Sequence, residues 1–125
     1  MKPITILVID DKKDIVELIE IILKMNGLNV IKATSSKAAI NKLKKQKVDL
    51  VISDIGMPDI DGFKLLDIVK KIHPHIPVVL MTGYYDIFSE KIALAKGAKA
   101  FLPKPFRAEE LINIVEREFG YALQA

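Results

Sequence analysis

Apolar runs alternate with segments of helical periodicity along the chain. The runs are rich in Ile, Val, Leu and Ala and have the length of buried strands: Ile4–Ile9, Val30–Ala33, Leu50–Ser53, Val78–Met81 and Ala100–Leu102. Each run precedes a segment whose apolar spacing predicts a helix, and these helices begin near Lys13, Ser36, Asp61, Ile87 and Ala108. Five strand–helix units with short connections predict a parallel sheet covered on both faces.

This order of elements predicts an α/β protein with a flavodoxin-like, doubly wound arrangement and the strand order 2-1-3-4-5. Local signals also predict where the helices stop. Asn26-Gly27 ends the first helix, Pro74 limits the third, and Gly97 and Gly120 follow the fourth and fifth. Asp61 directly precedes the third helix and has the side chain of an N-cap.

Length and composition indicate a single domain over residues 1–125 that can bury a core. Half of the residues are hydrophobic and 28% are charged, as in a folded globule rather than a disordered chain. The absence of cysteine excludes a disulfide framework, a thiolate metal site and a thiol nucleophile. No apolar run approaches the ~20 residues of a membrane span, and no signal-peptide pattern opens the chain. We therefore expect a cytoplasmic protein without membrane contact.

The formal net charge of +3 comes with a cluster of lysines at positions 37, 42, 44, 45 and 47. This cluster predicts the solvated side of the second helix and its exit. A nucleic-acid patch is the alternative, but no aromatic residues interleave with the lysines and no known nucleic-acid-binding motif is present. We expect no direct nucleic-acid binding.

Charged and hydroxyl side chains stand at the carboxyl ends of four predicted strands. Asp10 and Asp11 follow the first strand, Asp54 the third, Thr82 the fourth and Lys104 the fifth. In the order 2-1-3-4-5 these four strands are neighbours, and ligands bind at this edge of open α/β sheets. The sequence therefore predicts one crevice that holds three carboxylates, a hydroxyl and an ammonium group.

The charges in this crevice indicate its chemistry. Two carboxylates ~4 Å apart repel by roughly 4 kcal/mol at an effective dielectric constant near 20. Three carboxylates therefore favour a bound proton or a cation, and a hard oxygen-ligated ion such as Mg2+ fits best. Mg2+ that keeps water ligands usually meets a phosphate, which Thr82 and Lys104 are suited to contact. A carboxylate can then be the nucleophile that forms an acyl phosphate.

The chain resembles the receiver domains of two-component response regulators over essentially its whole length. The matching pieces are Asp10-Asp11, the stretch Asp54-Ile55-Gly56-Met57-Pro58-Asp59-Ile60-Asp61-Gly62, Met81-Thr82-Gly83 and Lys104-Pro105-Phe106. The resemblance implies a phosphoacceptor switch that takes a phosphoryl group from a histidine kinase onto Asp54. It also implies that the domain promotes only its own phosphorylation and dephosphorylation, and is not otherwise an enzyme.

The resemblance further implies the role of each site residue. Asp11, Asp54 and the backbone carbonyl of Gly56 would bind Mg2+, for which Mn2+ can substitute, and Asp10 would act partly through water. Thr82 and Lys104 would bind the phosphoryl group, and the peptide bond between Lys104 and Pro105 would be cis.

Four further positions would tune the switch. Phe101 stands where receivers carry an aromatic residue that turns inward once Thr82 moves toward the phosphoryl group. Gly83 leaves space for the phosphodonor. Gly56 has no side chain to orient water, and Tyr84 is large enough to shield the phosphoryl group, so we expect slow self-dephosphorylation. The alternative for Tyr84 is a side chain that simply points into solvent.

Other candidates have structural interpretations. We interpret Asp59 as a turn residue, and we interpret Met57 and Met81 as packing residues. His73 and His75 lie in a loop before the fourth strand, away from the predicted crevice, and we do not expect them to bind a metal.

The expected partners are a sensor histidine kinase or histidine phosphotransfer protein, and an output partner or output domain that the sequence does not identify. The resemblance places the partner surface on helix four, strand five and helix five, where Ile87, Phe88, Phe106 and Arg107 could contribute; the alternative for Phe106 is a place in the core. It leaves open a homodimer formed on phosphorylation.

Two rival functions use similar residues. A Mg2+-dependent phosphohydrolase of the haloacid-dehalogenase type would need an acid two residues after the nucleophile, where this chain has Gly56. A receiver-like interaction module that is never phosphorylated would usually lack one of the acids, the Thr or the Lys, and this chain keeps them all.

Overall fold

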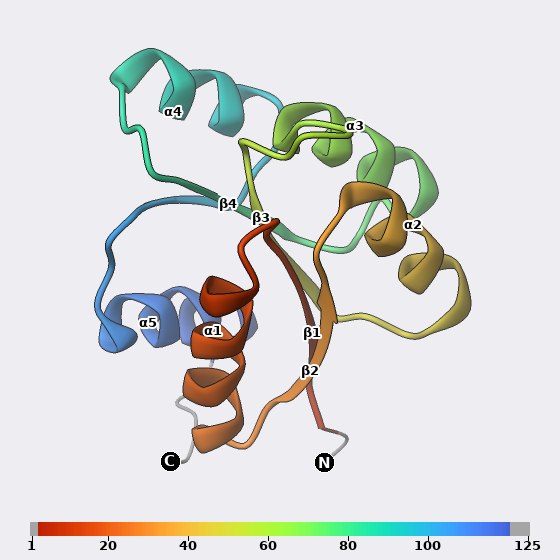
Figure 1. Cartoon of the computed structure of the whole chain (residues 1–125), viewed down its shortest axis with the longest axis vertical. Coiled ribbons are helices and arrows are strands. Elements are labelled where there is room, and N and C mark those ends of the chain that lie inside the picture. Colours follow the sequence, from red (N-terminus) through yellow and green to blue (C-terminus); the bar gives the residue numbers. More distant parts are fainter. Residues whose placement is uncertain (1–2, 121–125) are drawn as a thin grey trace.

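Five parallel strands form the central sheet of the computed structural model, which describes residues 3–120 (Figure 1). The strands are β1 (Thr5–Ile9), β2 (Asn29–Ala33), β3 (Leu50–Asp54), β4 (Val78–Thr82) and β5 (Ala100–Pro103). They lie in the order β2-β1-β3-β4-β5, and each neighbouring pair is parallel. The predicted doubly wound fold and its strand order are confirmed.

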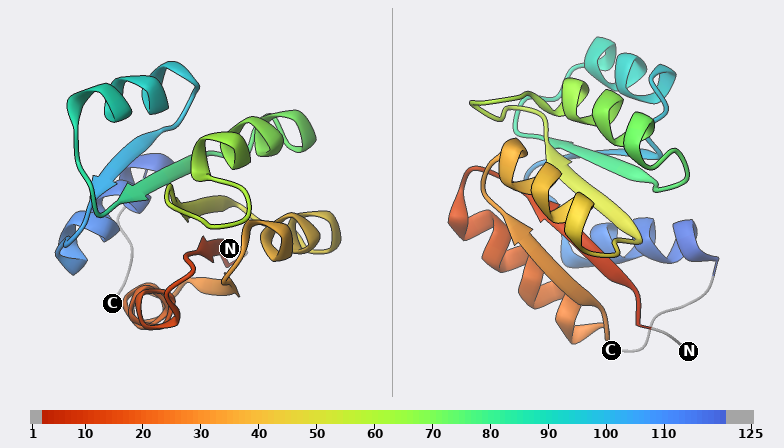
Figure 2. Two further views of the ribbon diagram at one scale, coloured as in Figure 1. Left: turned by 45° about the horizontal axis from the view of Figure 1, so that its top comes forward. Right: turned by 90° about the vertical axis from the view of Figure 1, so that its right-hand side faces the viewer.

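Helices cover both faces of this sheet (Figure 2). They are α1 (Lys13–Met25), α2 (Ser36–Lys45), α3 (Gly62–Ile72), α4 (Ile87–Ala95) and α5 (Ala108–Phe119). Alternate residues of a strand point to opposite faces. Accordingly Ile6 and Val8 pack with α1 and α5, whereas Leu7 and Ile9 pack with α2, α3 and α4. Within the described residues, no helix combines the length and apolar character that a bilayer-spanning segment needs.

Side chains cap the starts of α2 and α3, and for Asp61 this was predicted. The Ser35 side chain accepts a hydrogen bond from the Ala38 amide at 3.1 Å, and Asp61 accepts one from the Lys64 amide at 2.9 Å. Such caps satisfy amide groups that have no partner inside the helix. At the other end, α4 stops at Ala95 with Lys96 as its C-cap, one residue earlier than predicted.

Three strands extend one residue beyond the predicted ends. Asp54 still pairs with Met81, and Thr82 still pairs with Pro103, so these polar residues are the last members of β3 and β4 rather than loop residues. The prediction followed side-chain polarity, whereas the ladder depends on backbone groups. The consequence is functional: Asp54 and Thr82 are anchored on the rigid sheet.

Gly62, the first residue of α3, lies directly against the end of β3. A Cβ atom there would be 2.7 Å from both the Asp54 carbonyl oxygen and the Ile55 Cα, which are backbone atoms that cannot move aside alone. Gly62→Ala should therefore lower the free energy of unfolding by about 1–3 kcal/mol, the usual cost of overpacking. Urea unfolding measures this change.

Gly83→Ala is the matched control, because a Cβ at Gly83 would meet no atom of the described residues within 4 Å. We expect its unfolding free energy to stay within about 0.5 kcal/mol of wild type, as for most surface substitutions. Equal effects of the two substitutions would contradict the close packing at Gly62.

Candidate functional site

Three carboxylates converge at the carboxyl edge of the sheet. Asp10 and Asp11 follow β1 and Asp54 ends β3, and one oxygen from each lies within 4.8 Å of the other two. Asp10 is fully buried, Asp54 is 8% exposed, and Asp11 faces solvent. The structure thus brings together the predicted acids, with two held in the protein and one at the mouth of the site.

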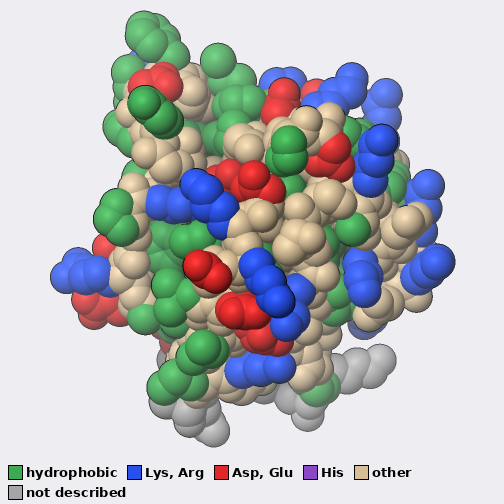
Figure 3. Space-filling model, viewed as in Figure 1, with side chains coloured by type: hydrophobic (Ala, Val, Ile, Leu, Met, Phe, Trp, Pro, Cys, Tyr) green, Lys and Arg blue, Asp and Glu red, His purple; other side chains and the backbone are tan. Residues whose placement is uncertain are grey.

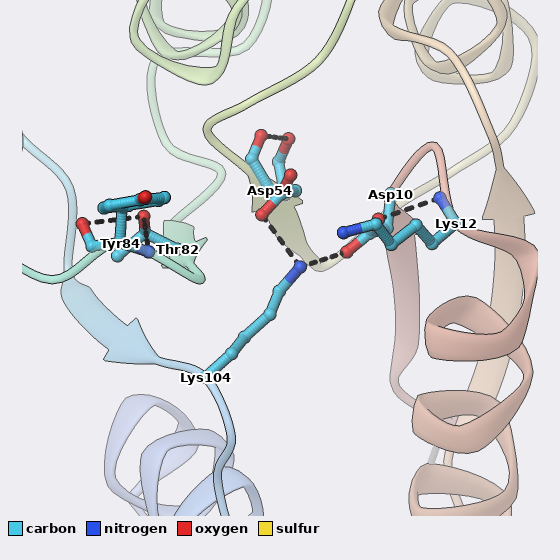
Figure 4. Close-up of polar contacts among 7 residues, drawn as sticks. Asp10, Lys12, Asp54, Thr82, Tyr84 and Lys104 are labelled. Carbon is cyan, nitrogen blue, oxygen red and sulfur yellow. Dashed lines mark hydrogen bonds and ion pairs between the residues drawn. The ribbon is translucent and has the colours of Figure 1, made fainter.

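The turn after β1 holds Asp10 in place. Its backbone amide donates to the Ala33 carbonyl at 3.2 Å, which extends the contact between β1 and β2. Its carboxylate accepts a hydrogen bond from the Lys12 amide at 2.9 Å, just before α1 begins (Figure 4). A buried carboxylate needs such partners, because an unpaired buried charge is costly.

The Lys104 ammonium bridges two of the acids. Its Nζ lies 2.6 Å from Asp10 Oδ2 and 2.9 Å from Asp54 Oδ1, so it points from the end of β5 into the centre of the site (Figure 4). The Lys104 amide donates to the Thr82 carbonyl at 2.7 Å, and the peptide bond to Pro105 is cis. Burial disfavours the charged ammonium, but the hydrogen bonds and charges of Asp10 and Asp54 outweigh it, so the pKa of Lys104 is raised.

The charge balance of the site favours a divalent cation. Three carboxylates and one ammonium leave two negative charges in excess. Carboxylate oxygens are hard ligands of the kind that Mg2+ prefers, and Mg2+ commonly uses only one or two of them while keeping waters. The exposed position of Asp11 and Gly56 leaves room for those waters. The donor set therefore fits Mg2+.

Thr82 is engaged with the loop that follows it rather than with the acids. Its hydroxyl donates to the Tyr84 carbonyl at 3.1 Å and accepts from the Tyr84 amide at 3.0 Å (Figure 4). This local turn is typical of Ser and Thr side chains. The Thr82 side chain is buried at the end of β4.

The aromatic residues divide into a buried and an exposed group. Phe101 is only 8% exposed and belongs to the core, so its ring is already inside in this structure. The ring of Tyr85 packs edge-on against it, with centroids 6.0 Å apart. Tyr84 is 91% exposed, which matches the alternative in which its side chain points into solvent. Tyr85 is the aromatic residue that covers Phe101, and no motif in the sequence indicates this contact.

The remaining candidates lie as follows. Gly56 and Gly83 are exposed at the edge of the site, and a Cβ at Gly56 would lie 3.5 Å from Asp54 Oδ2. Met57 and Met81 are buried, which confirms their packing role. His73 is the C-cap residue of α3, at the end of the helix opposite to the one beside Asp54, and its Nε2 lies 3.1 Å from the Leu43 carbonyl oxygen.

Removal of the Lys104 charge should destabilise the fold, because the fully buried Asp10 would lose its cation. We expect Lys104→Met to lower the free energy of unfolding by about 3 kcal/mol at neutral pH without Mg2+, in line with other broken buried ion pairs. Added Mg2+ should recover part of this loss by supplying a replacement charge. Urea unfolding with and without Mg2+ measures both effects.

Lys12→Met is the control, since the Lys12 side chain is exposed next to the same acids.

Because the pKa of Lys104 is raised by folding, the stabilisation of the fold by this ammonium is present below the unfolded lysine value of about 10.4. It is lost as the pH rises through the folded value. A Lys104→Met protein as stable as wild type at pH 7 would contradict the assigned role of the bridge.

Comparisons with known proteins agree on one family. The family model of the response regulator receiver domain matches residues 6–116. The response regulator protein FleR of Pseudomonas aeruginosa is 35% identical over 112 residues, which cover 90% of this chain and 24% of FleR. The nitrogen assimilation regulatory protein NtrX of Azorhizobium caulinodans is 36% identical over 114 residues, 90% of this chain and 25% of NtrX. The chain spans about a quarter of the length of these relatives.

Solved structures show the same fold. A CheY-like receiver domain protein from Methanospirillum hungatei superposes with a TM-score of 0.90 at 26% identity, and the match covers 95% of both chains. NtrX from Brucella abortus also gives a TM-score of 0.90, at 36% identity, with 95% of this chain and 27% of that chain covered.

Proposed function

Because the chain belongs to the receiver domains of two-component response regulators, we propose that it is a switch which accepts a phosphoryl group on Asp54. The observation that carries this proposal is the position of Asp54. It ends a central strand, stands within 4.8 Å of two further carboxylates, and has the Lys104 ammonium 2.9 Å from one oxygen.

The donor we propose is a phosphohistidine on a sensor kinase or phosphotransfer protein. An Asp54 carboxylate oxygen forms a bond to phosphorus, the bond between phosphorus and the imidazole nitrogen breaks, and the leaving imidazole takes up a proton. The product is an acyl phosphate. Lys104 is placed to stabilise the negative charge on the transferring phosphoryl oxygens.

We assign the Mg2+ ligands to Asp11, Asp54 and the Gly56 carbonyl, with Asp10 acting partly through water. When bound, the ion neutralises charge on the carboxylates and the phosphoryl oxygens. This assignment agrees with the two negative charges in excess at the site.

Phosphorylation would reach the surface through Thr82. A Thr82 hydroxyl that donates to a phosphoryl oxygen gives up its hydrogen bond to the Tyr84 carbonyl, which is one of the two bonds that it now makes with the Tyr84 backbone. The next residue, Tyr85, covers Phe101 and donates a 2.6 Å hydrogen bond from its hydroxyl to Glu90 on α4. Loss of the Thr82 contacts would therefore loosen the connection between β4 and α4.

The surface of α4 has the character of a protein contact. Ala93 is its buried residue, whereas Ile87, Phe88, Ile92 and Leu94 are between 47% and 74% exposed. Hydrophobic side chains gather over α4 at the upper left of the molecule (Figure 3). A helix that is apolar on several sides normally lies against another surface. We propose that an output domain or partner, or a second copy after phosphorylation, covers this face together with β5 and α5.

Within this proposal the domain turns over no separate substrate and meets its kinase in the cytoplasm. Direct contact with nucleic acid or membrane is not part of the proposed role.

The direct test is intact-protein mass after incubation with acetyl phosphate and Mg2+. Wild type should gain one phosphoryl group, about 80 Da, and Asp54→Asn should gain none, because an amide cannot form the acyl phosphate. Omission of Mg2+ should abolish most of the gain.

No gain in wild type, despite measured Mg2+ binding, would favour the unphosphorylated interaction module. Release of phosphate with continuous turnover of the donor would favour the phosphohydrolase. The decay of the phosphorylated mass gives the lifetime, and the lack of a side chain at Gly56 leads us to expect minutes or longer.

The proposed route from Thr82 to α4 depends on the Tyr85 hydroxyl. The hydrogen bond to Glu90 is also the main reason that the pKa of Tyr85 is raised. Tyr85→Phe keeps the ring contact with Phe101 but removes this bond, and should speed amide hydrogen exchange in residues 84–90 of the unphosphorylated protein. Exchange mass spectrometry measures this effect. Tyr84→Phe, which alters an exposed side chain, should match wild type, and equal exchange in all three proteins would contradict the route.

A further inference from the structure

The loop after β3 is tied to the start of α2 by three hydrogen bonds. Asp59 Oδ2 accepts from the Lys37 amide at 2.9 Å, and Asp59 Oδ1 accepts from the Ser36 amide at 3.2 Å. In return, the Ser36 hydroxyl donates to the Ile60 carbonyl at 2.6 Å. The partners are 22 to 24 residues apart in the chain, so this tie joins two separate elements.

This tie is well suited to persist. The Asp59 carboxylate meets amides at a helix N-terminus, where the helix dipole favours negative charge. The Lys37 amide is the main reason that the pKa of Asp59 is lowered, with a smaller contribution from the Ser36 amide against some burial. Ser36 itself is fully buried, so its hydroxyl has little access to competing water. The tie therefore holds the loop in a fixed position against the start of α2.

The same loop carries Gly56, the proposed source of a backbone ligand for Mg2+. One end of the loop is fixed because the Met57 and Gly62 amides both donate to the Ile55 carbonyl, at 2.9 and 2.8 Å. The buried Met57 side chain anchors it to the core. Gly56 has no side chain of its own that could anchor it. Beyond Met57, the contacts of Asp59 and Ile60 with α2 hold the outer part of the loop.

We propose that Asp59 is a positioning residue of the phosphorylation site, which holds the Gly56 carbonyl in place for Mg2+ by tying its loop to α2. This inference rests on the proposed function. A ligand on a restrained loop loses less freedom when the ion binds. Replacement of a residue that orients a metal ligand typically lowers the metal affinity by roughly 10- to 100-fold.

The competing explanation is that Asp59 only caps α2. Ser35 provides the matched control, because its side chain also caps α2, by accepting from the Ala38 amide. Among the residues that the structure describes, it has no hydrogen bond to the loop. Ser35→Ala should weaken the same helix while leaving the tie intact. A purely structural role would give both variants the same effect on Mg2+ binding.

The experiment is calorimetric titration of the unphosphorylated chain with Mg2+, with circular dichroism to verify folding. We expect Asp59→Ala to weaken Mg2+ binding about tenfold and Ser35→Ala to bind as wild type does. Asp59→Asn keeps one acceptor oxygen and the same size, so it should fall between Asp59→Ala and wild type. It also serves as the second variant if Asp59→Ala folds poorly.

The possible failures are distinct. Wild-type affinity in both Asp59 variants, or the same weakening in Ser35→Ala, would overturn the positioning role and leave the proposed function intact. If wild type itself binds no Mg2+, the proposed function fails and this inference fails with it.

Discussion

The contact of one lysine with two aspartates determines how the rest of the site can behave. The Lys104 ammonium stands 2.6 Å from Asp10 and 2.9 Å from Asp54, and Asp10 is fully buried. Without this cation, neighbouring carboxylates at the end of the sheet would repel one another in a medium that screens charge poorly. The bridge makes the folded state compatible with a cluster of acids, and it still leaves negative charge for a divalent ion.

That arrangement follows from the topology of the sheet. Residues from β1, β3, β4 and β5 can share one edge only because those strands are neighbours in the order that a doubly wound sheet produces. Because Asp54 and Thr82 are the final paired residues of their strands, the rigid ladder sets their spacing. The parts free to respond are the loops, and these contain Gly56, Gly83 and Tyr84.

The pattern of apolar residues predicted the fold well, because strand and helix periodicities differ and parallel connections allow few topologies. The acids, Thr82 and Lys104 could be predicted because strand ends collect at one edge. The tie between Asp59 and Ser36 could not be predicted, because the two residues are 23 positions apart in the chain and no local pattern marks the contact. The cover of Phe101 by Tyr85 depends on side-chain packing, which periodicity does not describe. Strand ends were placed one residue short because polarity changes before backbone pairing stops.

The most direct test of the central claim is a crystal structure of the chain with Mg2+ and beryllium fluoride, which stands in for the phosphoryl group. We predict a beryllium fluoride adduct, with beryllium bound to a carboxylate oxygen of Asp54. We also predict an ion bound by Asp11, Asp54 and the Gly56 carbonyl, and Lys104 in contact with a fluorine of the adduct instead of bridging the acids. The Thr82 hydroxyl should have left the Tyr84 backbone for the adduct. An unmodified Asp54, with Lys104 still between Asp10 and Asp54, would contradict the claim that this cluster is built to hold a phosphoryl group.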